Sequence, residues 1–393
     1  MTVRRKTTKK SGLTPFQRSV LWFFLKSAMV VFLTLLIYFI YLDSKITTLF
    51  SGQKWQVPAQ LYARVLHLAP GVHLSQTQFV DELKRLQYRV DPRLNGPGQY
   101  LVDGPKVHVY RRAFEFADGA QAASLFTVEF AGDFVQGLQK SGKALAKAKM
   151  EPQLLQHLVT AEQEDRELVQ LKQVPVTIRE TLLLVEDRDF YSHHGVSPLS
   201  VLRALITNLQ AGQTVQGGST LTQQLAKNMY TNQERTMVRK VNEALIALVL
   251  DYRYSKDQIL EAYFNEIFIG QFKDNPVHGL GLGSKLYFGK PLAELRPHEY
   301  ALLIAIIKGP SYYDPRRFPE RAAQRRDLIL HLMEDHGLLD GEQTKAALEQ
   351  PLDVIPLGQH LKGKYPAYID KVRQELRELV TDPLQMQEGL RVF

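Results

Sequence analysis

A single apolar segment, residues 20–42, follows directly after a basic N-terminal tail. Most of its side chains are large and apolar, and its one charged residue is Lys26, near its start. A helix of this length spans about 35 Å at 1.5 Å per residue, which exceeds the hydrocarbon core of a bilayer. Lys26 can extend its amine back to the membrane interface. The sequence therefore predicts one transmembrane helix at residues 20–42.

Positive charge is concentrated in the tail before this segment. Residues 1–19 contain six Lys and Arg side chains and no acid, out of a formal net charge of +8 for the whole chain. The positive-inside rule places such a tail in the cytoplasm and everything after residue 45 outside the membrane. A removable signal peptide is the alternative. It is disfavoured because the apolar stretch is too long and is followed by Asp43-Ser44-Lys45 rather than by a small-residue cleavage site.

The remaining composition excludes several classes of protein. Outside the tail the charges are close to balanced, whereas a nucleic-acid-binding protein should carry a basic stripe across a folded face. The chain has no cysteine, which rules out disulfides, thiolate metal sites and a cysteine nucleophile. Its 393 residues exceed the usual size of one hydrophobic core, so we expect two or three folded units.

The periodicity of apolar residues divides the chain into two halves. Residues 61–67, 107–110 and 126–130 alternate with period two and predict short strands, and residues 75–86 have helical spacing. This region reads as a small α/β module, either a spacer or a docking module for a protein partner. Residues 140–149, rich in Lys and Ala, are interpreted as a linker. From about residue 151 onward the period is 3.6, which predicts an all-helical second half.

The first motif is residues 182–195, LLLVEDRDFYSHHG, in which an apolar helix ends abruptly in four charged residues. A carboxylate placed where an apolar segment meets a cleft acquires a raised pKa and can act as an acid or a base. Glu186 is the candidate. The alternative is a solvated helix end in which Arg188 pairs with its acidic neighbours, and this segment alone does not decide between the two.

The second motif is residues 214–228, TVQGGSTLTQQLAKN. Thr220 and Gln223 have the spacing of a capping box, and the two preceding glycines permit a close approach to the backbone. A glycine-flanked helix N-terminus with Lys227 two turns later is suited to binding phosphate. A capping box alone explains the start of the helix, but it does not explain the run of polar side chains that follows.

The third motif is residues 235–250, RTMVRKVNEALIALVL. On a helix, Arg239, Lys240 and Glu243 lie on one face, because spacings of three and four residues bring side chains together. An ordinary surface ion pair is the alternative. The order of the charges weakens that alternative only slightly, since a cation N-terminal to the acid is the poorer arrangement for helix stability.

The fourth motif is residues 255–270, SKDQILEAYFNEIFIG. It starts with a second capping box, Ser255 with Gln258, and leads into a helix with apolar residues spaced by four. The helix predicted from Pro297 to Lys308 is mainly architectural. Lys308, just before Gly309-Pro310, is a site candidate with a weak claim.

Together, EDRDFYSHHG, GGSTLTQQLAKN, RKVNEA and ILEAYFNEIFIG, in this order and within 85 residues, resemble the glycosyltransferase family 51 module. That module is shared by class A penicillin-binding proteins and monofunctional transglycosylases. The basic tail, single span, α/β module and motif-bearing half are similar to the N-terminal part of class A penicillin-binding proteins of the 1b type. The α/β module would then be similar to the UB2H domain, which docks an outer-membrane lipoprotein activator.

This resemblance implies a multi-domain fold: a transmembrane helix, a small α/β module similar to UB2H, and a mainly α, lysozyme-like glycosyltransferase domain. The expected divisions are a cytoplasmic tail at 1–19, the span at 20–42, the docking module at 58–153, the glycosyltransferase domain at 154–364 and a linker at 365–393. The implied location is a bacterial inner membrane, with a cytoplasmic N-terminus and a periplasmic catalytic domain.

The resemblance also implies a reaction, the polymerisation of lipid II into glycan strands. Glu186 would remove the proton from the 4-hydroxyl of the acceptor lipid II as that oxygen attacks the anomeric carbon of the growing strand, with inversion. Undecaprenyl pyrophosphate leaves. Glu243 is the second carboxylate of the family pattern. It could orient the cations beside it, hold a divalent metal, Mg²⁺ or Mn²⁺, or stabilise positive charge at the sugar.

The remaining candidates, eight residues of the motifs and Lys308 after them, are implied to bind substrate, with fixed cations and amides that face the leaving group. They are His193, Gly217, Thr220, Gln224, Lys227, Asn228, Arg239, Lys240 and Lys308. The apolar segment 196–209 is either a core helix or, as the resemblance implies, a helix in the membrane surface that admits the lipid substrate. The implied partners are lipid II, the nascent strand, the membrane and the lipoprotein activator. A homodimer is compatible with the resemblance, and no organic cofactor or nucleic acid is expected.

The sequence departs from the family pattern in one respect, and two other functions remain as alternatives. Class A proteins continue into a transpeptidase domain with S-x-x-K, S-x-N and K-T-G motifs. Here Ser51-Gly52-Gln53-Lys54 matches the first by chance, without the other two in order, so we expect a chain that lacks this domain, as in a fragment. A lytic transglycosylase or muramidase would share the fold and a catalytic glutamate but needs no pyrophosphate cradle. A non-catalytic membrane scaffold is disfavoured by the intact Glu186 and Glu243.

Overall fold

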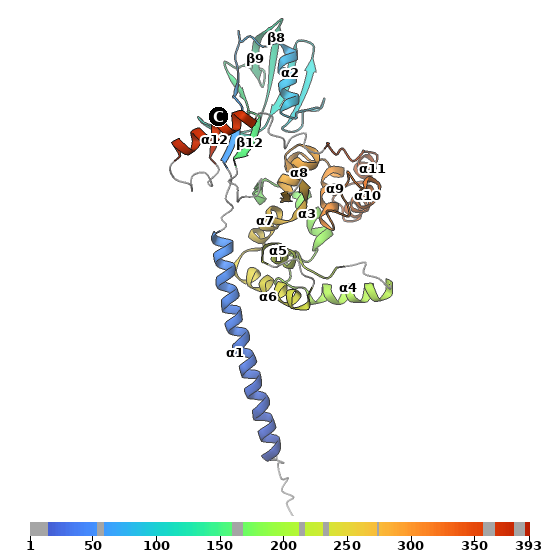
Figure 1. Cartoon of the computed structure of the whole chain (residues 1–393). Helices are drawn as coiled ribbons and strands as arrows, with labels where there is room; N and C mark the ends of the chain where they lie inside the picture. Colours follow the sequence, from blue (N-terminus) through green and yellow to red (C-terminus); the bar gives the residue numbers. More distant parts are fainter. Residues whose placement is uncertain are drawn as a thin grey trace, which may run out of the picture.

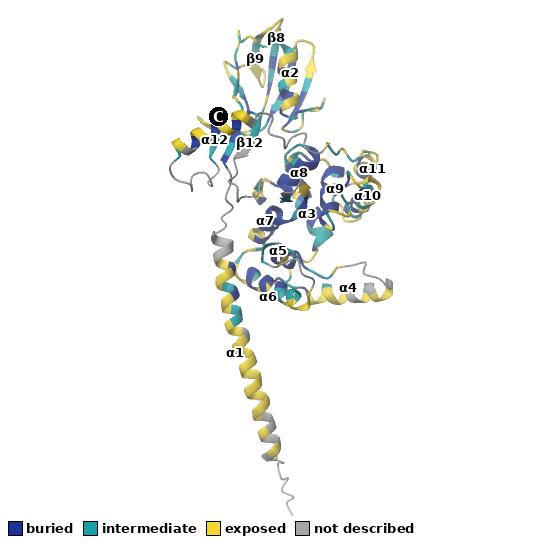
Figure 2. Ribbon diagram, viewed as in Figure 1, coloured by how far each residue is buried: buried dark blue, intermediate teal, exposed yellow. Residues whose placement is uncertain are grey.

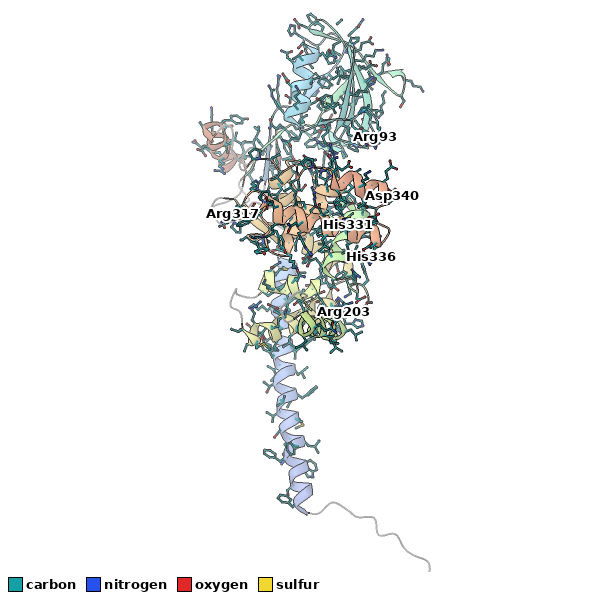
Figure 3. The ribbon with its side chains drawn as sticks, turned by 90° about the vertical axis from the view of Figure 1, so that its right-hand side faces the viewer. Arg93, Arg203, Arg317, His331, His336 and Asp340 are labelled. Carbon is teal, nitrogen blue, oxygen red and sulfur yellow. The ribbon has the colours of Figure 1, made fainter. Side chains whose placement is uncertain are left out.

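The computed structural model describes residues 15–52, 59–158, 168–211, 217–230, 236–272, 275–356, 366–380 and 390–393. One helix, α1 (Pro15–Gly52), projects from a helical domain, and a β-rich module lies at the other end of that domain (Figure 1). In Figure 3, Arg93 of the β-rich module and Arg203 of the helical domain mark these two ends, with Arg203 nearer to α1.

The predicted span is part of α1. Residues Trp22–Thr47 are long and apolar enough to cross a membrane, with a mean hydropathy of 2.3. The first turns of the span are exposed (Figure 2), whereas Leu42 and Ile46 are buried in the core of the helical domain. The hydroxyl of Tyr38 donates a hydrogen bond of 2.9 Å to Asn242. The end of α1 therefore packs as part of the helical domain.

The β-rich module contains a six-stranded sheet in the order β10-β9-β8-β5-β4-β3. Helix α2 (Gln76–Arg85) packs its apolar side, Phe79 and Leu83, into the core of the module. This confirms the helix and the two strands predicted at 107–110 and 126–130. The bounds are β3 (Arg89–Val90), β4 (Gln99–Asp103), β5 (Lys106–Arg111), β8 (Ser124–Ala131), β9 (Phe134–Lys140) and β10 (Lys143–Ala144). Strands β6 (Phe114–Phe116) and β7 (Gly119–Gln121) form a separate hairpin.

Two predictions in this module were wrong. Residues 61–67 do not form one strand, since β1 (Ala59–Tyr62) and β2 (Leu66–Leu68) belong to different sheets. The Lys- and Ala-rich residues 140–149 are not a linker, because they contain the end of β9, β10 and most of β11 (Ala148–Met150). Ser141 and Gly142 both have positive φ, 50° and 75°, which is the backbone of a tight hairpin turn. Lysines suit an edge strand because they discourage pairing with another chain.

The helical domain surrounds the apolar helix α9 (Pro297–Ile307), nearly all of whose residues are buried. The other helices are α3 (Val176–Glu186), α4 (Pro198–Ala211), α5 (Leu221–Tyr230), α6 (Met237–Arg253), α7 (Lys256–Glu266), α8 (Leu280–Phe288), α10 (Pro319–Asp335) and α11 (Gly341–Leu348), with 3-10 turns η1 (Leu171–Gln173) and η2 (Leu292–Glu294). The half is not entirely helical as predicted, because β13 (Phe268–Phe272) and β14 (Asn275–His278) form a hairpin. Its aromatic and β-branched residues favour strand over helix.

A small third cluster joins segments that are far apart in the sequence. Strand β1 pairs with β12 (Leu154–Leu158) on one side and with β15 (Arg391–Val392) on the other. Helix α12 (Pro366–Leu379) packs Ile369 and Val372 against Leu61 of β1. The described part of the predicted linker at 365–393 is therefore folded here. The exact domain boundaries that we drew stay predictions.

Among the described residues, Arg112 of the β-rich module makes a polar contact with the helical domain, and its side chain is 16% exposed. Arg112 donates to both carboxylate oxygens of Glu294, at the end of η2, and stacks over the ring of Tyr88 at 4.5 Å. Gly98 lies against the same carboxylate, and a Cβ at this residue would lie 2.5 Å from it. Gly98 also has φ +78°, so the close approach requires glycine on both counts.

Candidate active site

Glu186 is the last residue of α3, and its carboxylate is oriented by two other helices. Its Oε2 accepts a hydrogen bond of 2.9 Å from the Gln224 amide of α5. The amide oxygen of Gln224 accepts in turn from the hydroxyl of Tyr263 on α7, at 2.9 Å. Tyr263 is fully buried. The position of the carboxylate is thus fixed through α5 by the core of the domain.

Burial raises the pKa of Glu186 above its ordinary value. The Gln224 hydrogen bond and the positive charges of Arg325 and Lys308 lower this pKa in part, and the charge of Asp187 raises it. Its side chain nevertheless keeps partial exposure to solvent. A carboxylate that is desolvated, accessible and fixed in orientation has the properties of a general base.

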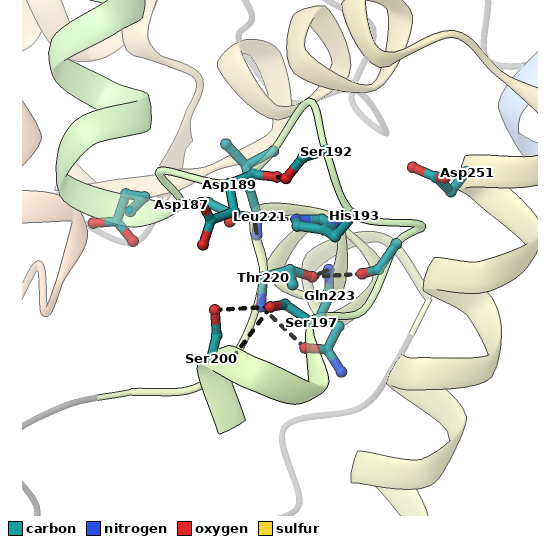
Figure 4. Close-up of polar contacts among 12 residues, drawn as sticks. Asp187, Asp189, Ser192, His193, Ser197, Ser200, Thr220, Leu221, Gln223 and Asp251 are labelled. Atoms are coloured by element: carbon teal, nitrogen blue, oxygen red, sulfur yellow. Dashed lines mark hydrogen bonds and ion pairs between the residues drawn. The ribbon is translucent and has the colours of Figure 1, made fainter. Parts of the chain in front are cut away.

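The loop of residues 187–195 is fastened to the N-terminus of α5. Asp187 Oδ2 accepts from the backbone N–H of Leu221 at 2.8 Å and lies 2.9 Å from His193 Nε2 (Figure 4). The hydroxyl of Thr220 donates to the carbonyl of Gly195 at 2.6 Å. Gly195 has φ +73°, and a Cβ there would lie 2.3 Å from the carbonyl oxygen of Ala247. This part of the motif therefore serves to bring the loop against α5 and α6.

The start of α5 has the predicted capping box. The Gln223 N–H donates to the Thr220 hydroxyl at 3.2 Å, and the Thr220 N–H donates to the Gln223 side chain at 3.0 Å. Gly217, just before it, is exposed, and no atom of the described residues would lie within 4 Å of an added Cβ. Packing within the described protein therefore does not require glycine at 217, which leaves room for a ligand.

Glu243 lies in a different environment from Glu186. It is 1% exposed, and each of its oxygens binds a cation one turn earlier on α6: Oε1 binds Arg239 and Oε2 binds Lys240 at 2.9 Å. This confirms that the three side chains share one face. The Lys240 amine also donates to Ser219 Oγ at 2.7 Å, which ties α6 to the segment before α5.

The other predicted residues lie on α5, in the 187–195 loop and at the end of α9, and they differ in exposure. Lys227 is exposed on α5, one turn after Gln224. Asn228 is partly buried, and its Nδ2 has no hydrogen-bond partner among the described residues. Lys308 caps the C-terminus of α9 and is exposed. The His193 side chain is 7% exposed and points to Asp187, so its contacts in this structure are with the protein.

The segment 219–224 lies between the two carboxylates. Ser219, at one end, reaches the Lys240–Glu243 pair, and Gln224, at the other, reaches Glu186. A base with a raised pKa thus stands on one side of the α5 N-terminus, and fixed cations stand on the other. This arrangement can remove a proton and stabilise an anion in the same reaction.

Sequence reasoning missed several residues that shape this site. Asp187 and Tyr263 lie inside two of the motifs. The signal for Asp187 was its position next to Glu186, and the signal for Tyr263 was its polar hydroxyl within an apolar helix. Ser219 was part of the glycine-containing loop. Arg325 of α10, whose charge lowers the pKa of Glu186, belongs to no motif. It is far from Glu186 in the sequence, so the sequence alone did not indicate that the two are close.

The one group among the described residues with the spacing of a three-ligand metal site is His298, Glu299 and Asp353. Each already has a protein partner: His298 binds Asp353 at 3.0 Å, and Glu299 binds Lys290 and the backbone N–H of Arg296. The group lies at the start of α9, at the opposite end from Lys308. These contacts explain the cluster without a metal.

Comparison with known families covers both halves of the chain. Residues 151–334 match the family described as Transglycosylase, and residues 68–150 match the family described as Bifunctional transglycosylase second domain, or UB2H. The chain matches the N-terminal part of class A penicillin-binding proteins. The helical half is thus a transglycosylase domain and the β-rich module a UB2H domain, as the motifs implied.

Several relatives that match 90% or more of this chain are named penicillin-binding protein 1B. The proteins of Vibrio cholerae, Haemophilus influenzae and Escherichia coli are 45%, 37% and 38% identical to this chain. The matches cover 90%, 100% and 94% of this chain, but only 46%, 51% and 44% of the respective relatives. The chain therefore spans about half the length of these relatives.

Proposed function

We propose that this chain is a peptidoglycan glycosyltransferase that polymerises lipid II into glycan strands during cell-wall synthesis. The observation that carries the proposal is the placement of a base and a cationic group on either side of the α5 N-terminus. Glu186 is the base, and Arg239 and Lys240 are the nearest fixed cations on α6. The transglycosylase domain and the similarity to penicillin-binding protein 1B support the same reading.

Glu186 accepts the proton of the acceptor 4-hydroxyl as this oxygen attacks the donor's anomeric carbon. The new glycosidic bond forms with inversion while the bond to the pyrophosphate oxygen breaks. Undecaprenyl pyrophosphate leaves with the bonding electron pair. Fixed positive groups stabilise this developing charge without having to reorganise. Lys227, Lys240 and the start of α5 are suited to that role.

Glu243 fits a divalent cation poorly, because both of its oxygens already bind cations. Mg²⁺ or Mn²⁺ at this carboxylate would have to displace Arg239 or Lys240. We therefore assign Glu243 the role of orienting these two side chains toward the leaving group. An ion that bound the pyrophosphate alone would supply further positive charge there.

The proposed site faces a membrane surface. Helices α4 and α6 both lie toward the end of the helical domain from which α1 extends (Figure 1), and most of the described residues of α4 are exposed (Figure 2). Both helices expose apolar side chains, which is typical of helices that lie in a membrane interface. These side chains are Leu199, Val201, Leu202, Ile206 and Leu209 on α4 and Met237, Val238 and Val241 on α6. The lipid substrate would enter from this side.

The topology and the partners follow from this reading. The tail of residues 1–19 would be cytoplasmic and the two domains periplasmic, in a bacterial inner membrane. The UB2H domain lies at the end of the molecule away from α1 (Figure 1), where an outer-membrane lipoprotein activator could reach it. The nascent glycan strand is the donor. A homodimer stays an expectation of the family resemblance.

A muramidase is the second enzymatic candidate, because it would use the same glutamate. The experiment is to incubate the chain in detergent with labelled lipid II, and separately with finished peptidoglycan, and to separate the products by gel electrophoresis. Glycan strands from lipid II, with finished peptidoglycan left intact, are the expected result. Digestion of peptidoglycan without strand synthesis would establish the hydrolase. If the chain neither makes strands nor digests peptidoglycan, a non-catalytic scaffold would be favoured.

A further inference from the structure

Lys256, the first residue of α7, binds the 187–195 loop. Its amine donates to the carbonyl oxygen of His193 at 2.6 Å and forms an ion pair with Asp251 of α6. The same amine lies 4.9 Å from the centre of the Phe190 ring. A carbonyl, a carboxylate and an aromatic face thus surround one ammonium group, and two of these three partners belong to the loop.

These partners are shielded from water, so the contacts are not an ordinary surface ion pair. Phe190 is fully buried, and the side chains of Asp251 and Lys256 are 8% and 19% exposed. Removing the ammonium would leave a buried carboxylate without its main partner, which is costly. Asp251 faces the loop from α6 (Figure 4). Its Oδ2 also lies 3.5 Å from Nδ1 of the exposed His194.

The 187–195 loop connects Lys256 to Glu186, so fixing the loop also fixes the end of α3. Lys256 fixes the backbone of His193, and the side chain of His193 lies 2.9 Å from Asp187. Asp187 directly follows Glu186 and also accepts from the N–H of Leu221. A shift of the loop would therefore move the end of α3, and with it the carboxylate bound to Gln224.

We propose that Lys256 is a positioning residue, whose ammonium fixes the 187–195 loop and thereby holds Glu186 in place for the transfer reaction. The catalytic part of this proposal rests on the proposed function. The restraint of the loop can be tested without measuring activity. Misplacing a reacting group by about 1 Å can cost on the order of a hundredfold in rate.

Releasing the loop has a distinctive effect on the pH profile. Asp187, Gln224, Tyr263, Lys308 and Arg325 are the groups that face Glu186 from its own loop and from α5, α7, α9 and α10. Burial is the main cause of its raised pKa. A loosened loop admits water, so the pKa falls toward the ordinary value and the acid limb of kcat moves to lower pH. Loss of a nearby positive charge would move the limb the other way.

The test uses Lys256→Met, which keeps the length of the side chain and removes its charge. Lys256→Arg retains a cation for the same partners, and Asp251→Asn weakens the pair from the other side. Lys345→Met, at an exposed site on α11, is the control. For each full-length variant, kcat, KM and their pH dependence are measured with lipid II, and amide hydrogen exchange is followed across the protein.

The Met variant is expected to lose about tenfold to a hundredfold in kcat with little change in KM. Its acid limb should move to lower pH, and faster exchange should be confined to the 187–195 loop. Lys256→Arg should recover most of the rate. If the parent is inactive but the loop still loosens, the proposed function fails and the restraint stands.

Parent-like kcat and parent-like loop exchange in Lys256→Met would overturn the proposal. It would also be overturned by exchange that rises throughout the domain, since Lys256 would then serve general stability. If Lys256→Met does not fold, Asp251→Asn decides on the same criteria.

Discussion

Single residues in this site owe their properties to their neighbours. Glu186 and Glu243 are both carboxylates on helices of one domain. Glu186 is bound by a neutral amide, and burial raises its pKa, while Glu243 is enclosed by two cations. The first environment suits a group that gains and loses a proton. The second suits a group that holds two cations in place.

Lys308→Met tests the electrostatics at Glu186. The charge of Lys308 lowers the pKa of this carboxyl, so its removal should raise that pKa further. The base works in its ionised form, and the acid limb of kcat/KM should therefore move to higher pH. The measurement is a pH–rate profile with lipid II, with Lys345→Met as control. An acid limb that stays unchanged or moves to lower pH would contradict this effect of the Lys308 charge.

Glu243→Gln tests the structural part of the cationic group. The Glu243 and Arg239 side chains are 1% and 15% exposed, so removing the carboxylate leaves the Arg239 charge uncompensated, which costs on the order of 3 kcal/mol. Lys240, 44% exposed, adds little to this cost because solvent screens its charge. Thermal unfolding of the variant should show a clearly lower midpoint than that of the parent. Glu180→Gln, at an exposed position on α3, is the control. A midpoint equal to the parent's would mean that Arg239 and Lys240 do not depend on this carboxylate.

At the scale of elements, the helices that carry the motifs were predictable because local signals agree with packing. The predicted capping boxes at Thr220 and Ser255 are present at the N-termini of α5 and α7. The β13–β14 hairpin was missed because a short aromatic and β-branched run can form either structure. Arg325 could not be found at all, since the folding of α10 onto α9, rather than any local pattern, brings it to the site.

Helix α4 tests the predicted membrane surface. Leu202 and Leu209 are 53% and 73% exposed. If they enter the lipid interface, replacing both by Asn should remove part of the apolar contact that brings enzyme and lipid substrate together, and KM for lipid II should rise about tenfold with little change in kcat. Leu328→Asn, at an exposed position on α10, is the control. An equal effect of both changes would contradict the assignment.

At the scale of the whole molecule, the UB2H and transglycosylase domains are joined by a specific polar contact. Besides Glu294, Arg112 donates to the carbonyl of Leu86 at 2.7 Å and to Glu151 at 3.3 Å. Its guanidinium is therefore almost fully used, in a buried position. This contact sets the UB2H domain on η2, directly before α9, the helix whose C-terminus is capped by Lys308.

A double-mutant cycle with Arg112→Met and Glu294→Gln measures this contact. Because both side chains are largely buried, the coupling energy should be roughly 2 kcal/mol. The exposed pair Lys84–Asp81 on α2 is the matched control and should couple by less than about 0.5 kcal/mol. Thermal unfolding of the single and double variants gives both values. Additive effects at Arg112 and Glu294 would show that the domains are held by other contacts.

The most direct test of the account compares Glu186→Gln with Glu180→Gln and with the parent in lipid II polymerisation. The account predicts strands from the parent and from Glu180→Gln, and none from Glu186→Gln. A carboxyl whose pKa is raised by folding contributes stability at low pH that is lost as the pH rises. The amide removes that penalty, so Glu186→Gln should unfold at neutral pH no earlier than the parent. Strand synthesis by Glu186→Gln at the parent's rate would contradict the central role of Glu186.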